Sequence, residues 1–214
     1  YRFYAEFQSH EAEFDYLKSL DIEERINEIA WLPGSGGNVF LLSTNDKTVK
    51  LWKVGEKVTR RPLRKAAETG RYGVAVPLER LEVPPLGEAM REVTATPKRV
   101  FANGHTYHVN SLSANADGET FLSADDLRVN LWHVEHAKTS FNVVDIKPEN
   151  MEDLTEVITC ARFHPSSAHS LVFSTSRGAI RLIDMRESAL CDGRGVVLRS
   201  PEAAAEEMSY FSEI

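Results

Sequence analysis

Cysteine is scarce in this chain of 214 residues, with Cys160 and Cys191 as the only two. They lie far apart and form no Cys-x-x-Cys pair, which argues against a disulfide framework or a zinc site and favours a reducing cytosolic or nuclear location. Long apolar runs are missing as well, because no stretch approaches the roughly 18–20 apolar residues that a membrane-spanning helix needs. We therefore expect no membrane span. Tyr1 stands first instead of Met, so we expect a chain that begins within a longer gene.

Sequence signatures of catalysis are also missing. The chain contains no Gly-x-Ser-x-Gly, His-Glu-x-x-His, phosphate-binding loop or Gly-x-Gly-x-x-Gly motif. Ser166 and Ser167 lie near His164 and His169, but this composition is typical of a turn and not of a catalytic triad. The sequence therefore favours a protein with no catalytic residues, metal or cofactor of its own.

Charge is unevenly distributed along the chain. The net charge is −7, made up of −3 in residues 1–54, +4 in residues 55–99 and −8 in residues 100–214. A surface of this sign repels a phosphate backbone, so we do not expect nucleic-acid binding. It would attract basic peptides instead. The alternative, that the acidity only keeps the domain soluble, stays open on charge alone.

Three segments of the chain repeat one pattern of short apolar runs. Each copy contains a first run, a second run that ends in Ser, and a third run that ends in Leu followed by Trp or Ile. Ser43, Ser123 and Ser174 stand nine residues before Trp52, Trp132 and Ile183. The three copies comprise residues 26–31, 40–43 and 48–52, then 109–112, 120–123 and 128–132, then 157–163, 171–174 and 179–184.

Alternating apolar residues and intervening turn residues predict three short strands per copy. A fourth strand is expected at 141–146. Four antiparallel strands form the blade of a propeller, and the Leu-Trp ending with Gly104-His105 upstream is the signature of WD repeats. We therefore predict an all-β, WD40-type β-propeller that is incomplete, with about three four-stranded blades. The predicted divisions are 1–25, the end of a preceding blade, and blades at 26–105, 106–148 and 149–214.

Extra residues separate the first two copies. Ser43 lies 80 residues before Ser123, whereas Ser123 lies 51 residues before Ser174, close to the usual period of about 40–45. The insertion spans about 56–98 and alternates apolar and charged residues at 78–83. We predict an extended hairpin arm here, with a floppy loop as the alternative. Its candidate binding residues are Arg60, Arg61, Arg64, Lys65, Leu81 and Val83.

The topology of a meander assigns the loops to two faces. The loop that enters a first strand lies at the same end of the sheet as the turn between the second and third strands. Binding residues are commonly carried by such loops, and here acidic residues dominate them. The arm follows a third strand, so it should leave from the opposite end. The expected loop face contains Ile22–Glu24, Asp46, Thr106–His108, Asp125, Asp126, Glu149–Leu154 and Glu156.

A more specific resemblance covers nearly the whole chain. The regulatory B family of protein phosphatase 2A, a WD-repeat family, is similar to this sequence in ten places. The similarity is weakest at about 55–98 and 193–208. The matching segments are 7–11, 14–20, 40–48, 101–103, 105–108, 122–127, 144–148, 154–159, 188–192 and 211–214.

This resemblance implies a propeller of seven blades, of which the chain supplies about three. It also implies a heterotrimer with a scaffold subunit and a catalytic Ser/Thr phosphatase subunit. The arm would bind the scaffold, and the acidic face would recruit phosphoprotein substrates with basic motifs. The motif match implies substrate-facing roles for Tyr107, His108, Asp126, Glu152 and Leu154, to which the loop argument adds Asp125 and Glu156. A generic WD-repeat adaptor is the alternative function.

Structural roles compete with binding roles at several of these positions. Asp46 and Asp126 each stand six residues before a Trp, where WD repeats often bury an Asp that hydrogen-bonds within the blade. We expect Asp125 to be the more exposed of its pair. His105, Trp52 and Trp132 are expected to be structural. Leu154 is either an apolar binding spot within an acidic rim or a side chain that is buried beneath its own loop.

Overall fold

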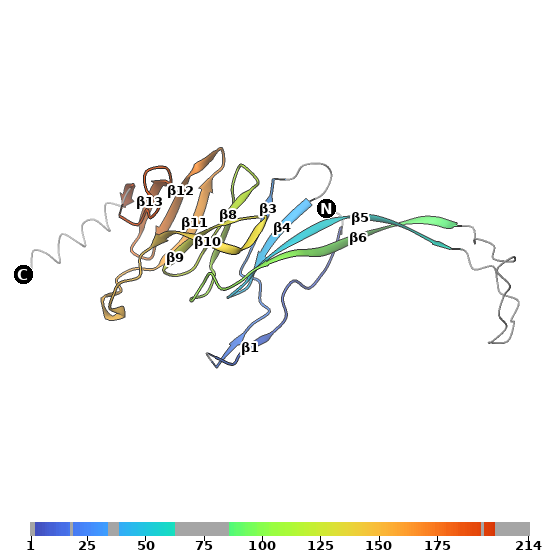
Figure 1. Cartoon of the computed structure of the whole chain (residues 1–214), viewed down its shortest axis with the longest axis horizontal. Coiled ribbons are helices and arrows are strands. Elements are labelled where there is room, and N and C mark those ends of the chain that lie inside the picture. The colour runs from blue at the N-terminus through green and yellow to red at the C-terminus, as the bar shows by residue number, and fades with distance from the viewer. Residues whose placement is uncertain (1–2, 18, 34–38, 63–85, 194, 200–214) are drawn as a thin grey trace, which may run out of the picture.

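The computed structural model describes residues 3–17, 19–33, 39–62, 86–193 and 195–199. Almost all of the regular structure in these ranges is β (Figure 1). Twelve strands form three four-stranded antiparallel sheets, and two further strands form a small hairpin. The hairpin contains β1 (Glu13–Asp15) and β2 (Leu20–Ile22). No helix in the described ranges is long and apolar enough to cross a membrane.

Each sheet is a meander whose strands are paired in chain order. The first contains β3 (Glu28–Leu32), β4 (Val39–Thr44), β5 (Val49–Pro62) and β6 (Leu86–Phe101). The second contains β7 (Ser111–Ala114), β8 (Thr120–Ala124), β9 (Arg128–His133) and β10 (His136–Asp145). The third contains β11 (Ile158–His164), β12 (Ser167–Thr175), β13 (Ala179–Asp184) and β14 (Val196–Arg199).

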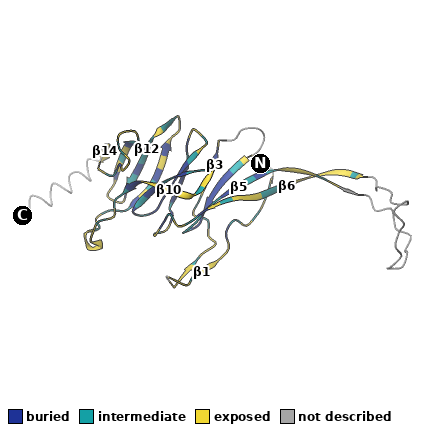
Figure 2. Ribbon diagram, in the orientation of Figure 1, coloured by how far each residue is buried: buried dark blue, intermediate teal, exposed yellow. Residues whose placement is uncertain are grey.

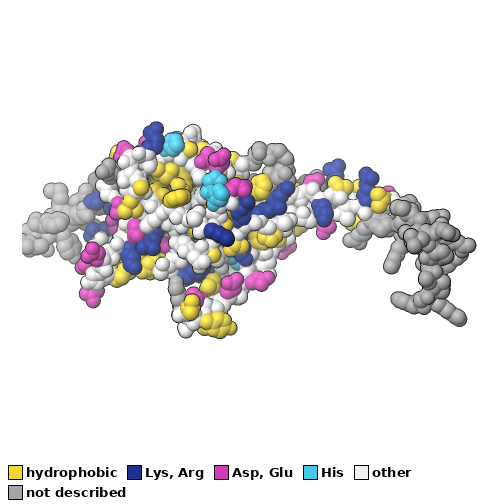
Figure 3. All heavy atoms as spheres, in the orientation of Figure 1, with side chains coloured by type: hydrophobic (Ala, Val, Ile, Leu, Met, Phe, Trp, Pro, Cys, Tyr) yellow, Lys and Arg dark blue, Asp and Glu magenta, His cyan; other side chains and the backbone are white. Residues whose placement is uncertain are grey.

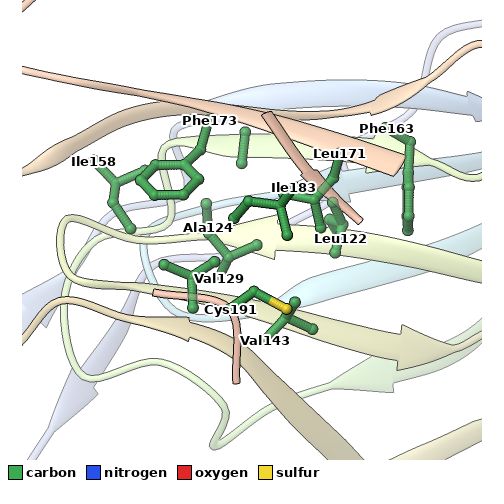
Figure 4. Packing of buried hydrophobic residues seen from close by; sticks show 12 residues of the cluster. Leu122, Ala124, Val129, Val143, Ile158, Phe163, Leu171, Phe173, Ile183 and Cys191 are labelled. Carbon is green, nitrogen blue, oxygen red and sulfur yellow. The ribbon is translucent and has the colours of Figure 1, made fainter. Parts of the chain in front are cut away.

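Two apolar layers join the three sheets. Between the first and second sheets, Phe101 at the end of β6 packs edge-on against Phe121 and Trp132, with ring centroids 4.8 and 5.5 Å away. Between the second and third sheets, Leu122, Val129 and Val143 meet side chains of β11, β12 and β13 (Figure 4). Burial is concentrated in these layers (Figure 2). The sheets therefore stack face to face as neighbouring blades do.

The first strands of the three sheets lie side by side, because β7 contacts both β3 and β11. The sheets are thus arranged around a common inner edge. Three four-stranded antiparallel sheets with this arrangement confirm the predicted all-β fold, part of a β-propeller.

The insertion in the first sheet forms a long two-stranded hairpin that extends away from the body (Figure 1). Its strands β5 and β6 pair from Val49↔Phe101 outward to Pro62↔Leu86. The extended hairpin predicted for the insertion is confirmed over these residues. Its distal part, 63–85, lies outside the described residues.

Candidate functional site: the loop face

Loops from neighbouring sheets meet at one end of the propeller. The backbone N–H of Val109, just before β7, donates to the carbonyl of Asp46 in the β4–β5 turn, at 3.0 Å. The same contact recurs one blade on, where Ile158 donates to the carbonyl of Asp126 at 2.7 Å. This repeated bond confirms that the loops entering first strands share a face with the turns between second and third strands. We call this surface the loop face.

An apolar spot joins two of these loops. The hydroxyl of Tyr107 donates to Sδ of Met151 at 3.9 Å, and Met151 is 43% exposed. Met151 begins a short 3₁₀ helix, Met151–Asp153, and the half-buried Leu154 forms its C-cap. Asn150 caps its other end, because its side chain accepts from the N–H of Glu152. The cap leaves Glu152 and Asp153 exposed beside the apolar spot.

His108 and Asp46 form a second contact across the loop face. Nδ1 of His108 lies 3.0 Å from Oδ2 of Asp46, and Asn27 also donates to Asp46, at 2.8 Å. Burial alone would raise the pKa of Asp46, but these two hydrogen bonds and the charges of His108 and Lys47 lower it below its usual range. Asp46 is therefore not a buried aspartate that hydrogen-bonds within its own blade, although its spacing from Trp52 suggested this in-blade role.

Asp125 is buried, so the prediction that it is the more exposed of the two aspartates is wrong. Its residue exposure is 0%. Oδ2 lies 2.9 Å from Nδ1 of His105, and Oδ1 accepts from the N–H groups of Leu127 and Arg128. The in-blade role assigned by spacing to Asp126 belongs to Asp125, which faces inward and cannot contact a ligand in this conformation. Asp126 is half-buried at the loop face.

His105, Ser123 and Trp132 complete the buried network of the second sheet. Nε2 of His105 lies 2.6 Å from Oγ of Ser123, and Nε1 of Trp132 donates to the same oxygen at 2.8 Å. The structural roles predicted for His105, Trp52 and Trp132 are confirmed, since all three are at least 90% buried.

The first sheet builds a related network with different residues. Asn45 stands where the second sheet has Asp125, and its Oδ1 accepts from the N–H groups of Lys47 and Thr48. Nε1 of Trp52 lies 3.1 Å from Oγ of both Ser9 and Ser43. Neighbouring His10 contributes its ring, which bonds to Ser9 and to the carbonyl of Thr48. Sequence spacing did not identify His10, which precedes Ser43 by 33 residues instead of 18.

Glu156 forms an ion pair with another residue of the chain, Arg181. Its Oε1 lies 2.8 Å from Nη2 of Arg181, and the two side chains are 18% and 20% exposed. Nη1 of Arg181 also donates to the carbonyl of Asp192 at 3.0 Å. A ligand that used Glu156 would have to compete with this ion pair, so its binding role stays a prediction.

Charge on the loop face is more mixed than the sequence suggested. Lys47 reaches across it, with Nζ 2.6 Å from the carbonyl of Thr106, and Arg181 neutralises Glu156. Two acidic regions remain: a shallow hollow lined by Glu23, Glu24 and Arg25, and the exposed carboxylates at 149–153. Acidic side chains are scattered over the body in the view of Figure 3. The acidity of the loop face is therefore patchy.

The arm has one apolar face. Close to the body, Trp52 and Val54 pack with Val93 and Ala95, and farther out Val58 is 57% exposed. Lys and Arg side chains follow the arm outward (Figure 3). Of the predicted scaffold residues, Arg60 is exposed on β5. Nothing is described for the side chain of Arg61, and Arg64, Lys65, Leu81 and Val83 lie outside the described residues.

A comparison with protein families finds one match in the middle of the chain. Residues 95–133 match the model of the WD domain, G-beta repeat. These residues run from the end of β6 through the loop that carries His105 to β9, so the match contains the whole buried network of the second sheet. The chain thus carries a WD40 repeat, which supports a WD-repeat protein of the interaction-adaptor kind.

Proposed function

We propose that this chain is a regulatory, substrate-recruiting subunit of a heterotrimeric Ser/Thr phosphatase of the protein phosphatase 2A type. The proposal rests on the long sequence resemblance to the regulatory B family and on the form of the molecule. In this role the catalytic metal chemistry belongs to the partner subunit, while this chain provides two binding surfaces. One surface would hold the substrate and the other the scaffold.

The separation of the loop face from the arm is the observation that carries this proposal. The turn Asn45–Thr48 lies at the loop face, and β5 then runs away from it for fourteen residues. The arm therefore projects from the other end of the sheet. A protein that brings a substrate to a tethered enzyme needs two such surfaces, because binding at one must leave the other free.

The apolar spot at the loop face suits a peptide that carries basic residues beside an apolar one. Tyr107, Met151 and Leu154 offer an apolar centre, Glu152 is exposed in the same 3₁₀ helix, and Asp126 lies on the neighbouring turn that binds Ile158. Apolar contact at the centre of such a patch contributes most of the affinity, and charges at the rim mainly steer the encounter. Substrates with clustered Lys and Arg residues beside a Leu or Phe fit this arrangement.

The arm suits a protein partner of extended form. Its outer part presents Val58 and Ala89 on the face that also carries the exposed pair Glu56 and Arg91, because Val58 pairs with Arg91 across the hairpin. A two-stranded hairpin without a covering layer is only marginally stable in water. Docking against the scaffold would supply the missing layer.

A pull-down with purified scaffold and catalytic subunits tests the proposal. We expect the complete polypeptide to recover both. Replacing residues 57–97 by a short Gly-Ser turn should abolish recovery and leave the affinity for a basic peptide unchanged. Recovery of neither subunit by the unaltered protein would overturn the proposal.

Charge reversal tests the loop face separately. The double variant Asp126→Lys with Glu152→Lys should weaken binding of a basic peptide about tenfold or more and leave assembly intact. Glu119→Lys is the matched control, because Glu119 is an exposed carboxylate in the β7–β8 turn at the opposite end of the second sheet. Loss of assembly and peptide binding together in the double variant would mean that these carboxylates are structural.

A generic WD-repeat adaptor is the second candidate, favoured by the WD40 match at residues 95–133. It would use the same loop face but need no scaffold. Unimpaired peptide binding together with no recovery of either phosphatase subunit would select this candidate.

A further inference from the structure

The inner edge of the second sheet is closed by two side chains from other sheets. Both polar groups of the Leu112 backbone in β7 point away from the sheet toward the inner edge. The N–H donates to Oε2 of Glu28 at 2.6 Å, and the carbonyl accepts from Nη1 of Arg162. Leu112 is fully buried, so these groups need partners within the protein.

Glu28 and Arg162 also bind each other. Nη2 of Arg162 donates to Oε1 of Glu28, although 134 residues separate the two in the chain. Glu28 begins β3 in the first sheet, and Arg162 lies in β11 of the third. One ion pair, with the Leu112 peptide groups between its members, therefore ties together the inner strands of all three sheets.

Both residues lie next to loop-face segments. Glu28 comes directly after Glu23–Asn27, which leads from the acidic hollow into β3. Arg162 lies four residues after Ile158, the first residue of β11, and the N–H of Ile158 bonds to the carbonyl of Asp126. The Met151–Val157 loop comes immediately before β11. A change in the separation of β3 and β11 would thus move the two acidic regions of the loop face apart or together.

We propose that Glu28 and Arg162 are positioning residues that form a clamp across the inner strands and fix the distance between the acidic hollow and the Met151–Val157 loop. The docking consequence rests on the proposed function of the loop face, but the clamp itself does not. A peptide long enough to touch both acidic regions would depend on this fixed distance, because a preorganised site avoids the ordering cost of binding.

The clamp is more than a surface ion pair. The Glu28 side chain is 19% exposed and that of Arg162 45%, and each also satisfies a buried backbone group. Burial alone would lower the pKa of Arg162, but the hydrogen bond and charge of Glu28 outweigh it and raise that pKa. The guanidinium is charged, because arginine is not deprotonated in proteins.

Distances between labels at Glu24 and Asp153 test the clamp directly. Both residues are exposed, and ketone-bearing amino acids there can carry spin labels without altering Cys160 or Cys191. We expect one narrow distance distribution in the unaltered protein and a broad one in Arg162→Met. The swap Glu28→Arg with Arg162→Glu should keep the distribution broad, because it would place a donor against the N–H of Leu112 and an acceptor against its carbonyl.

Two controls keep the test decisive. Arg186→Met removes a pair that is local to the third sheet, Arg186 with Asp184, and should leave the distribution unchanged. Arg162→Lys keeps the charge but reaches fewer acceptors, so it should fold and give an intermediate width. Hydrogen exchange at the Leu112 amide should accelerate in Glu28→Ala.

The outcomes separate the clamp from the docking function. A narrow, unchanged distribution in folded Arg162→Met and Arg162→Lys would overturn the clamp. A broadened distribution with a severalfold loss of basic-peptide affinity would support both. A broadened distribution with unchanged peptide affinity would support the clamp and overturn the docking role proposed for the two acidic regions.

Discussion

Oδ2 of Asp125 lies 2.9 Å from Nδ1 of His105, and both side chains are almost completely buried. A carboxylate only accepts hydrogen bonds, so His105 donates from Nδ1, and in the neutral imidazole Nε2 then accepts from the hydroxyl of Ser123. That hydroxyl accepts in turn from Nε1 of Trp132. The four side chains form one directed chain of hydrogen bonds that joins the loop before β7 to β8 and β9.

Removing Asp125 should therefore destabilise the fold, whereas removing its neighbour should not. Asp125→Ala leaves His105 and the N–H groups of Leu127 and Arg128 without their acceptor, and we expect a loss of about 3 kcal/mol in the free energy of unfolding. Asp126→Ala should change it by less than about 0.5 kcal/mol. Urea unfolding of both variants measures the difference. Equal losses would contradict the assignment of the in-blade role to Asp125.

His10 should make the stability of the first sheet depend on pH. Burial, followed by the charge of Lys50, lowers the pKa of His10 from 6.5 to about 4. The unfolded chain binds this proton more tightly than the folded one, so stability should fall as pH decreases from 6.5 toward 4. We expect a loss of about 2 kcal/mol over this window.

His10→Gln tests the pH dependence, since glutamine keeps a donor for the carbonyl of Thr48 but does not titrate. The slope of unfolding free energy against pH between 6.5 and 4 should become flatter. His164→Gln, at an exposed histidine, should leave that slope as it is. An unchanged slope in His10→Gln would mean that His10 is not the responsible group.

Phe101 should dominate the contact between the first two sheets. It is 1% exposed and meets both Phe121 and Trp132 edge-on. Phe101→Ala should cost about 3–5 kcal/mol through lost burial and the cavity left behind. Val100→Ala is the adjacent control, at a side chain that is 48% exposed, and should cost less than about 1 kcal/mol. Thermal unfolding of the two variants gives the comparison.

The repeat in the sequence was sufficient for the fold but not for every side chain on the loop face. Ser43, Ser123 and Ser174 with their downstream partners aligned the three copies, and alternating apolar residues predicted strands, because the side chains of a strand alternate between its two faces. A shift of one residue exchanges the inward and outward positions of a strand. Asp125 and Asp126 are adjacent, so an error of one residue in the spacing exchanges their roles. The count of six residues from Trp132 selected the wrong member of the pair.

A contact between two residues that are far apart in the sequence and differ in type leaves no repeated pattern, so sequence spacing cannot predict it. Glu28 and Arg162 occupy no equivalent positions in the repeat, and Arg181 is the partner of Glu156 only because β13 passes beside the Met151–Val157 loop. Tyr107 and Leu154 were chosen from motif resemblance. Met151, which actually contacts Tyr107, follows from the three-dimensional meeting of two loops.

A double-mutant cycle on Glu156 and Arg181 should separate structure from binding at the edge of the loop face. Because both side chains are mostly buried, Arg181→Met should leave Glu156 unpaired and cost about 2 kcal/mol in the free energy of unfolding. Glu156→Gln should cost about 1 kcal/mol. The double variant should lose less than the sum, with a coupling of about 1–2 kcal/mol.

Peptide binding by the same variants decides the role of Glu156. If Glu156 serves mainly to hold Arg181, Glu156→Gln lowers the melting temperature and leaves the affinity for a basic peptide within about twofold of the unaltered protein. A tenfold loss of affinity without a change in stability would instead place Glu156 in direct contact with the ligand. Arg186→Met is the control, because its exposed pair with Asp184 lies within a single turn and should affect neither measurement.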